Sequence, residues 1–414
     1  MRSPIPVRWI ALTIFVFSAV LNYLDRQVLA TMAEIWTTRH DFAFMPSDYG
    51  HLVQYFSIAY AATALFVGSF IDRIGLNRGA TISVAVWGIA SFGTGMSHSV
   101  HELLLWRILL GAAEASGVTA VGKAVSLYLY PKEQAVGTAM GQLGLSLGAG
   151  MAPGFAVYFA YQHDWRWTFY AVGIISMLWI PVWLVTSRVI PPVAGYVHAA
   201  HKHSFGLLKD PKLWALILGN FLAMTVYSLW TNWPPRYLVR MHHLTPAQTA
   251  EYTWIIPICG YFGAMLGGSI SWRLIQRGKT PVFARKRACM LAAILLLSTA
   301  AIPFLPTPTL ATAGMCLSFF LVAAWSTNHY TLPIDIYGPG RAAFGVSSLI
   351  LAYGLMQFVI SSPLAWVTDR YGFMPVCMLF AFMPIASYAV VHWLIPDSAH
   401  PDPVEDAQAV RTAA

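Results

Sequence analysis

The feature that most constrains this chain is a series of twelve apolar blocks, most of them about 20 residues long, the length that an α-helix needs to cross the hydrocarbon core of a bilayer. Charged residues make up only 10% of the 414 residues, against about 25% in soluble domains. The blocks are residues 9–30, 50–71, 79–98, 102–124, 135–161, 167–186, 213–235, 248–272, 286–304, 309–334, 343–366 and 373–394. The sequence therefore predicts an all-α membrane protein with twelve transmembrane helices.

The first block follows two arginines, Arg2 and Arg8, an arrangement that is also typical of secretory signal peptides. No convincing small-residue cleavage site comes after the block, whereas eleven further apolar blocks do. We therefore expect the first block to be retained as a membrane helix.

The net charge of +8 is unevenly distributed along the chain. If both termini lie on one side of the membrane, 17 of the 25 lysines and arginines fall on that side, when Lys286 and Arg287 at the edge of the block 286–304 are counted with it. Five fall on the other side, and the remaining three are counted within the blocks. Such an excess is typical of the cytoplasmic side. It predicts a multi-pass protein of the inner cell membrane with both termini cytoplasmic. Membrane lipid is an expected partner, and nucleic acid is not.

A polar segment, residues 187–212, separates six blocks from the six that follow. It predicts an N-terminal six-helix bundle over 1–186, a cytoplasmic linker, a C-terminal six-helix bundle over 213–395 and a cytoplasmic tail over 396–414. In such 6+6 folds, binding takes place near the middle of the membrane. The His-Lys-His run at 201–203 could bind a metal, but a solvated linker explains it better.

Two of the blocks carry charged pairs. Asp25 and Arg26 are adjacent in the first block, while Arg107 and Glu114 are seven residues apart in the fourth. Seven residues are about two helical turns, which places both side chains on one face about 10 Å apart. Because a charge in a membrane helix costs roughly 2.5–3.5 kcal/mol on insertion scales, such residues usually face a bundle interior or an aqueous path.

These four residue types suit the transport of an anion with a proton. Arg26 and Arg107 can form forked, charge-assisted bonds to a carboxylate. Their other explanation is internal pairing with Asp25 and Glu114, which offsets the cost of burial. The two explanations are compatible, because an acid that takes up a proton releases its arginine. Glu114 is the stronger candidate for carrying the proton, and Asp25 could instead orient Arg26.

The chain shows no sequence signature of an enzyme or of a bound cofactor. It has no GxxxxGK[ST] loop, GxSxG elbow or HExxH helix. The four cysteines have no metal-ligand spacing and are expected to be small packing residues: Cys259, Cys289, Cys316 and Cys377. We therefore predict neither catalysis, nor a metal site, nor a cofactor.

A loop after the second block is repeated in the second half of the chain. Residues 68–78 read GSFIDRIGLNR, and residues 267–279 read GGSISWRLIQRGK, in which Trp272 stands in place of Asp72. Glycines permit a tight turn between helices, and the charged residues can cap helix ends. The repeat supports a duplicated bundle.

The first of these loops resembles the signature loop between the second and third helices of the major facilitator superfamily. Narrower likenesses lie elsewhere in the chain: Asn22 to Arg26, Arg107 with Glu114, Trp165 to Phe169, Trp233 to Leu238, and Thr331 to Asp335. Together they resemble the anion:cation symporter family and, within it, transporters of hexuronates. The resemblance covers nearly the whole chain and implies two six-helix bundles that alternate access to a central site.

The resemblance also implies roles for individual residues. The acids that match Asp25 and Glu114 serve proton coupling in the family. The arginines that match Arg26 and Arg107 serve the anion site. Tyr23 and Tyr60 match tyrosines that contact the substrate, although a lone tyrosine in a membrane helix is more often a packing residue.

The second half offers further substrate contacts. Tyr227 and Trp230, spaced i and i+3, could stack on a sugar face, although most of the 16 tryptophans must be packing or interface residues. Asn328 offers both a donor and an acceptor, and we prefer it to the neighbouring His329. Gln357 is a similar but weaker candidate.

One stretch departs from the family pattern. Residues 140–148, MGQLGLSLG, carry leucine where some relatives place a polar substrate contact. Gln142 or Ser146 could take its place, and the three glycines of the stretch predict close helix packing. The particular sugar acid therefore stays open.

The sequence predicts a monomeric symporter that moves a small organic anion together with a proton, with a hexuronate as the first candidate. The rival within the same class is a transporter of another carboxylate, such as an aldonate, an aldarate or an aromatic acid. A non-transporting receptor of the same fold is the rival from another class, and an intramembrane enzyme is a third. A receptor does not need a protonatable acid deep in the membrane.

Overall fold

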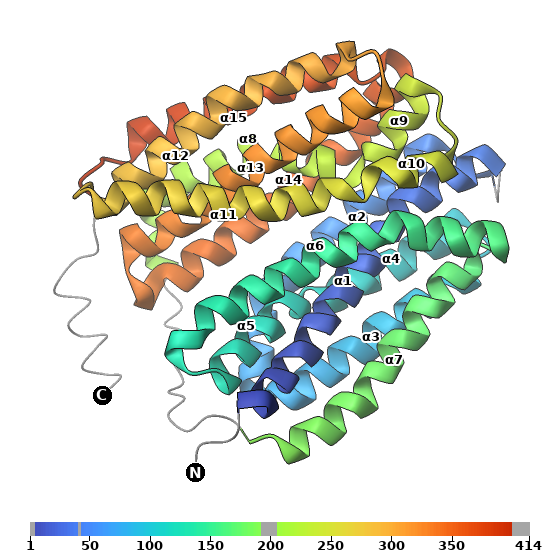
Figure 1. Ribbon diagram of the computed structural model, residues 1–414, viewed down its shortest axis with the longest axis horizontal. Coiled ribbons are helices and arrows are strands. Elements are labelled where there is room, and N and C mark those ends of the chain that lie inside the picture. Colours follow the sequence, from blue (N-terminus) through green and yellow to red (C-terminus); the bar gives the residue numbers. More distant parts are fainter. Residues whose placement is uncertain (1–4, 40–42, 192–204, 400–414) are drawn as a thin grey trace. The chain divides into compact units, whose positions relative to one another are not determined.

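The computed structural model describes residues 5–39, 43–191 and 205–399 (Figure 1). These residues form α-helices and short 3-10 helices and no β-strand. Eleven helices in the described part of the chain are long and apolar enough to cross a membrane. The prediction of an all-α membrane protein is confirmed. The histidine run at 201–203 and the tail from residue 400 onward lie outside the described residues.

The helices follow the predicted apolar blocks closely. They are α1 (Ile5–Arg39), α2 (Pro46–Ile74), α3 (Leu76–Met96), α4 (Val100–Glu114), α5 (Ser116–Tyr128), α6 (Pro131–Gln162), α7 (Arg166–Val189), α8 (Pro211–Asn232), α9 (Pro234–His242), α10 (Pro246–Thr253), α11 (Ile255–Gln276), α12 (Pro281–Leu295), α13 (Pro308–Tyr337), α14 (Pro339–Tyr371) and α15 (Met374–Leu394), with the 3-10 helices η2 (Phe205–Lys209) and η3 (Leu296–Phe304). The block 50–71, which is not among the eleven, lies in α2, a helix of 29 residues.

Hydroxyl side chains define where several helices begin. The side chains of Ser99, Thr245, Thr280 and Thr307 each accept a bond from the backbone N–H three residues later. Such N-caps satisfy donors that have no partner within the helix. The starts of α4, α10, α12 and α13 are therefore set by local sequence as well as by hydrophobicity.

The chain forms two compact units. Unit 1 comprises Met1–Tyr196, Asn232–Ile258 and Gln357–Asp369, and unit 2 comprises Val197–Thr231, Cys259–Met356 and Arg370–Ala414. In unit 1, α1 packs along α6, and α3 packs along α7 (Figure 1). The helices α9 and α10 also belong to unit 1. The division into bundles 1–186 and 213–395 stays a prediction.

The fourth block forms two helices in direct succession. The helix α4 ends at Glu114 and α5 begins at Ser116, while Ala115 between them keeps right-handed helical angles, φ −55° and ψ −24°. The two helices together form one candidate membrane span, Val100–Tyr128, in agreement with the predicted block. At this junction Asn22 donates a bond from Nδ2 to the backbone oxygen of Glu114 at 3.3 Å, and a side chain on Gly117 would lie 2.9 Å from the same Nδ2. Asn22 therefore ties α1 to the junction between α4 and α5.

Glycines allow the helices of unit 1 to approach closely. A Cβ on Gly144 would lie 2.9 Å from the Val16 backbone oxygen, and one on Gly148 would lie 2.2 Å from the Val20 oxygen. Both glycines belong to α6. Because they have no side chain, α6 can pack directly against the backbone of α1. The close packing predicted for the 140–148 stretch is confirmed.

Unit 2 uses the same device between α11 and α13. A Cβ on Gly263 would lie 2.0 Å from the Phe320 oxygen, and one on Gly267 would lie 2.4 Å from the Ala324 oxygen. The repeated loops also share a turn device, since Gly75 ends α2 with a φ of 85° and Gly278 follows α11 with a φ of 80°. Glycine adopts such left-handed backbone without steric cost.

The α1–α6 contact gives a prediction about stability. Gly148→Ala should lower the free energy of unfolding by about 1–3 kcal/mol, because the new methyl group must push α6 away from α1. The measurement is the apparent melting temperature of the purified protein in detergent.

The matched control is Gly154→Ala, also in α6, where an added Cβ meets nothing within 4 Å. There the better helix propensity of alanine should leave the melting temperature unchanged or slightly raised. Equal effects of the two substitutions would contradict the packing argument.

Candidate functional site

A cross-helix ion pair joins two of the predicted residues in unit 1. The Nε atom of Arg26 on α1 lies 3.1 Å from Oε2 of Glu114 at the end of α4. The Glu114 side chain is fully buried, and that of Arg26 is 15% exposed. This carboxylate lies at the junction between α4 and α5. The predicted internal pairing is thus present for Arg26.

Three aromatic rings surround the Arg26 guanidinium. Its Cζ atom lies 4.8 Å from the ring centroid of Tyr23, 4.9 Å from that of Phe56 and 4.5 Å from that of Tyr60. Each distance is within the range of cation–π attraction. We call Tyr23, Phe56 and Tyr60 the aromatic cage. The structure therefore brings together four predicted residues: Tyr23, Arg26, Tyr60 and Glu114.

Asp25 points to a different helix from its neighbour Arg26. It is fully buried, and its Oδ2 accepts a bond from the Ser91 hydroxyl on α3. Its Oδ1 is buried without a hydrogen-bond partner among the described residues. Successive residues in an α-helix are about 100° apart, so Asp25 and Arg26 cannot share a partner easily.

Arg107 is among the largest buried side chains of the described structure, with 1% of its surface exposed. Its Cζ lies 5.8 Å from the ring centroid of Phe169, and its charge interacts with those of Asp25 and Glu114. Its Nε and Nη2 have no hydrogen-bond partner among the described residues. The predicted pairing of Arg107 with an acid is therefore electrostatic rather than a direct bond.

Two acids and two arginines thus form a buried group with no net charge. Five of their polar atoms are buried and without a partner in the described structure: Asp25 Oδ1, Arg26 Nη2, Arg107 Nε, Arg107 Nη2 and Glu114 Oε1. Buried polar groups in folded proteins nearly always have partners, so such a cluster of exceptions needs an explanation. A bound ligand, a proton or water would provide one.

Gln357 also lies in unit 1. Its Oε1 accepts a bond from the Ser57 hydroxyl on α2 at 2.5 Å. One turn further on, the Ser362 hydroxyl donates to Gln54 Oε1 at 2.7 Å. These two hydrogen bonds join α2 to the later part of α14. Gln357 thus contacts Ser57, which follows Phe56 of the aromatic cage in the sequence.

The other three predicted residues lie in unit 2 and make packing contacts there. The indole N–H of Trp230 donates to the Ser318 hydroxyl at 2.9 Å, and Tyr227 packs against Phe319 at 4.9 Å between ring centroids. Asn328 donates to the Ala324 oxygen of its own helix, with its Oδ1 buried and unpartnered among the described residues. Their role in binding a substrate stays a prediction.

His329, the alternative to Asn328, has a structural explanation. Its ring is stacked on Trp325 at 4.4 Å between centroids, and its Nε2 lies 2.9 Å from the Leu216 oxygen. It is fully enclosed by these contacts. The preference for Asn328 over His329 as a substrate contact stays a prediction.

The sequence reasoning missed several residues of unit 1. Phe56 lies four residues before Tyr60, and this i, i+4 spacing predicts that the two side chains share one face of α2. Ser91 was one small polar residue in an apolar block and gave no comparable signal. Glu34 lies in the part of α1 that extends beyond the predicted block 9–30.

Glu34 belongs to a second charged cluster of unit 1. Asp369 near the end of α14 bonds to Arg236 on α9 and lies 2.9 Å from Arg240 Nη2. The buried Glu34 on α1 interacts electrostatically with both arginines. We call these four residues the second charge cluster; it balances two acids against two bases.

The four cysteines are free, and Cys289 and Cys377 are buried. Within the described ranges, no three or more His, Cys, Asp or Glu side chains are grouped in a way that could hold a metal ion.

Acids and arginines in the interior of membrane helices usually mark the path of an ion or a polar substrate. The family model described as Major Facilitator Superfamily matches residues 15–343 of this chain. The chain therefore belongs to the Major Facilitator Superfamily, a family of transporters and not of enzymes.

Relatives extend the comparison over nearly the full chain. The chain is 24% identical to the Hexuronate transporter of Escherichia coli (strain K12), with 95% of each sequence covered. It is 23% identical to the Galacturonate transporter of Dickeya chrysanthemi, with 74% of this chain and 94% of that protein covered. The crystal structure of a D-xylose-proton symporter matches with a TM-score of 0.73 at 13% identity, covering 94% of this chain and 99% of that one, which shows the shared fold.

The second charge cluster gives a prediction. Asp369→Asn should lower the free energy of unfolding by about 1–3 kcal/mol, because the buried Arg236 loses a charged acceptor. The control is Asp164→Asn, since Asp164 is 54% exposed and pairs with a partly exposed Arg166 at 3.6 Å. Exposed pairs contribute little, so this control should change the apparent melting temperature in detergent much less. A stable Asp369→Asn protein would show that the cluster does not support the fold.

Proposed function

We propose that this protein is a proton-coupled symporter that carries a small organic anion, a hexuronate in the first place, across the inner membrane. The observation that carries the proposal is the buried Arg26–Glu114 pair inside the aromatic cage. An arginine held by a carboxylate in a dry interior suits an exchange in which the substrate's carboxylate takes the place of the protein's own.

The exchange requires Glu114 to bind a proton. A protonated Glu114 no longer neutralises Arg26, so the guanidinium becomes available to an incoming carboxylate. The substrate anion then restores the charge balance that the interior requires. Release of the anion reverses the sequence, since Arg26 regains Glu114 once its proton leaves. Proton and anion therefore move in the same direction.

Arg107 and Asp25 support a second point of recognition. Two unpartnered nitrogens on Arg107 can donate to one carboxylate in a forked arrangement. Asp25, bonded to Ser91 through one oxygen only, is our second candidate for proton coupling. In this scheme Arg107 and Asp25 form a looser pair beside the closed pair of Arg26 and Glu114.

A sugar acid fits these groups because it joins a carboxylate to a ring bearing hydroxyls. Tyr23 and Tyr60 can present ring faces and hydroxyls, and Gln357 can present an amide. Tyr227, Trp230 and Asn328 are the substrate contacts that we propose from unit 2. The hexuronate and galacturonate transporters among the relatives support this class, at an identity of 23–24%.

We also propose how the protein is placed in the cell membrane. The excess of basic residues in alternate loops supports a cytoplasmic location for both termini. We expect a monomer with the bundles 1–186 and 213–395, the linker 187–212 and a cytoplasmic tail, working by alternating access without a cofactor.

Uptake by proteoliposomes tests the function against its rivals. With an inward proton gradient, radiolabelled hexuronate should accumulate above its external concentration, and without the gradient it should only equilibrate. Accumulation of an aldonate, an aldarate or an aromatic acid instead would identify another carboxylate transporter. A receptor would accumulate nothing under either condition, and an enzyme would convert the label.

Glu114→Gln tests the coupling role. Glutamine retains the shape and an oxygen acceptor for Arg26 but cannot exchange a proton at neutral pH. We expect gradient-driven accumulation to fall to background while substrate counterflow persists. The control is Glu251→Gln, which changes an exposed carboxylate on α10 and should leave both activities intact. Normal active uptake by the Glu114 variant would refute its role.

Arg107→Lys tests forked recognition of the anion. An ammonium group keeps the charge but not the fork. Loss of one charge-assisted bond of about 1.5–3 kcal/mol predicts at least a tenfold weaker affinity. Isothermal titration with the transported acid measures it, with the exposed Arg188→Lys as the control. Full affinity in a variant of normal thermal stability would exclude bidentate binding at this position.

A further inference from the structure

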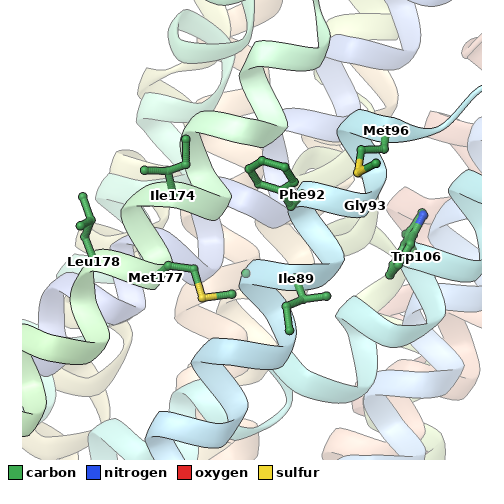
Figure 2. Close-up of a pocket in the computed structure, with 9 residues that line it drawn as sticks. Ile89, Phe92, Gly93, Met96, Trp106, Ile174, Met177 and Leu178 are labelled. Carbon is green, nitrogen blue, oxygen red and sulfur yellow. The ribbon is translucent and has the colours of Figure 1, made fainter.

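A groove outside the charged site lies between three helices of unit 1. It has a volume of about 430 Å³ and is lined by apolar side chains of α3, α4 and α7 (Figure 2). Figure 2 shows Ile174, Met177 and Leu178 of α7 beside Ile89 and Phe92 of α3. Its size is within the range of about 300–1,000 Å³ that is usual for small-molecule sites.

Two glycines of α3 form part of its lining. A Cβ on Gly93 would lie 2.3 Å from the ring of Trp106 on α4, and one on Gly88 would lie 3.0 Å from Cε of Met177 on α7. The flat backbone at these positions lets α4 and α7 approach α3 while leaving space between the side chains. The groove is therefore a product of the sequence and not of loose packing.

The groove is expected to face the bilayer, because exposed apolar side chains on helices long enough to cross a membrane line it. Its lining residues on α3 and α7 belong to segments that are apolar and long enough to cross a membrane. Ile89, Phe92, Ile174 and Leu178 are all exposed, with Leu178 60% exposed. Because lipid surrounds such side chains, the molecules available to fill the groove are those with hydrocarbon chains.

Charged groups of both signs lie at one end of the groove. Met96, a lining residue, ends α3, and Arg166 at the start of α7 donates to the backbone oxygen of Ser97 at 3.3 Å. Asp164 lies 3.6 Å from the same guanidinium and is 54% exposed. The Tyr170 ring joins the two regions, since it packs on Phe92 at 4.7 Å between ring centroids.

We propose that the groove binds one acyl chain of a zwitterionic phospholipid, with its phosphate at Arg166 and its ammonium group at Asp164. An anionic lipid fits this end less well, because Asp164 already neutralises Arg166. A zwitterionic headgroup carries the same two charges in complementary order. The proposal is independent of the transport function, since none of these residues belongs to the charged site.

Native mass spectrometry of the purified protein tests acyl-chain binding. Delipidated protein is mixed with phosphatidylethanolamine, and the fraction that carries one lipid is measured. Leu178→Trp should fill the groove and lower the apparent affinity for the first lipid about tenfold. Ile174→Trp is a second variant of the same design, which guards against a local misfold.

The matched control is Val185→Trp on the same helix, which adds the same bulk at a position that is 63% exposed and does not line the groove. It should bind lipid like the unaltered protein. If all three tryptophan variants bind lipid equally well, the groove is not a lipid site.

Competition between headgroups tests the charged end. The unaltered protein should prefer phosphatidylethanolamine to phosphatidylglycerol, and Arg166→Gln should abolish this preference while some acyl-chain binding persists. Equal binding of the two lipids by the unaltered protein, or a preference for phosphatidylglycerol, would overturn the assignment of the headgroup.

Discussion

The structure of unit 1 depends on how four charged side chains are kept inside a bundle of apolar helices. Each charge in a membrane helix is costly, so Asp25, Arg26, Arg107 and Glu114 are stable there only as a neutral set. The set is balanced in charge but incomplete in hydrogen bonds, since at least one polar atom of each residue is buried without a partner among the described residues. A fully satisfied network would hold one arrangement, whereas this one can gain bonds from a proton or an anion.

Close helix packing makes this arrangement possible. Gly148 brings α6 against α1 near the turn that carries the charges, and Gly111 brings α4 within reach of the Phe56 backbone, where a Cβ would lie 2.4 Å from its oxygen. Gly117 leaves room for Asn22, which bonds to the Glu114 backbone at the junction between α4 and α5. Small residues therefore determine the positions of Glu114 and the aromatic cage, although glycine itself has no functional side chain. Such small-residue contacts are the usual basis of helix association in membranes.

Much of this fold could be predicted from sequence because hydrophobic block length maps directly onto membrane helices. The burial of Asp25, Arg107 and Glu114 could also be predicted from the sequence, since exposing their charges to lipid would be costly. The sequence could not show which acid pairs with which arginine. Arg26 reaches Glu114 while Asp25 turns to Ser91 because adjacent residues point about 100° apart, and the rotation of α1 within the bundle decides which one meets α4. The bond from Asn22 to the Glu114 backbone could not be predicted for a similar reason, since it joins two different helices.

The aromatic cage explains how Arg26 can be both held and available. A second carboxylate would hold the guanidinium firmly but would also cancel the charge that an anion has to find. The rings of Tyr23, Phe56 and Tyr60 attract the cation through their quadrupoles without neutralising it. In the proposed function, Arg26 therefore keeps its position and its positive charge when Glu114 is neutral. Because the cage holds the guanidinium while Glu114 is its direct charged partner, one protonation step would change the affinity for an anion with little movement of the arginine.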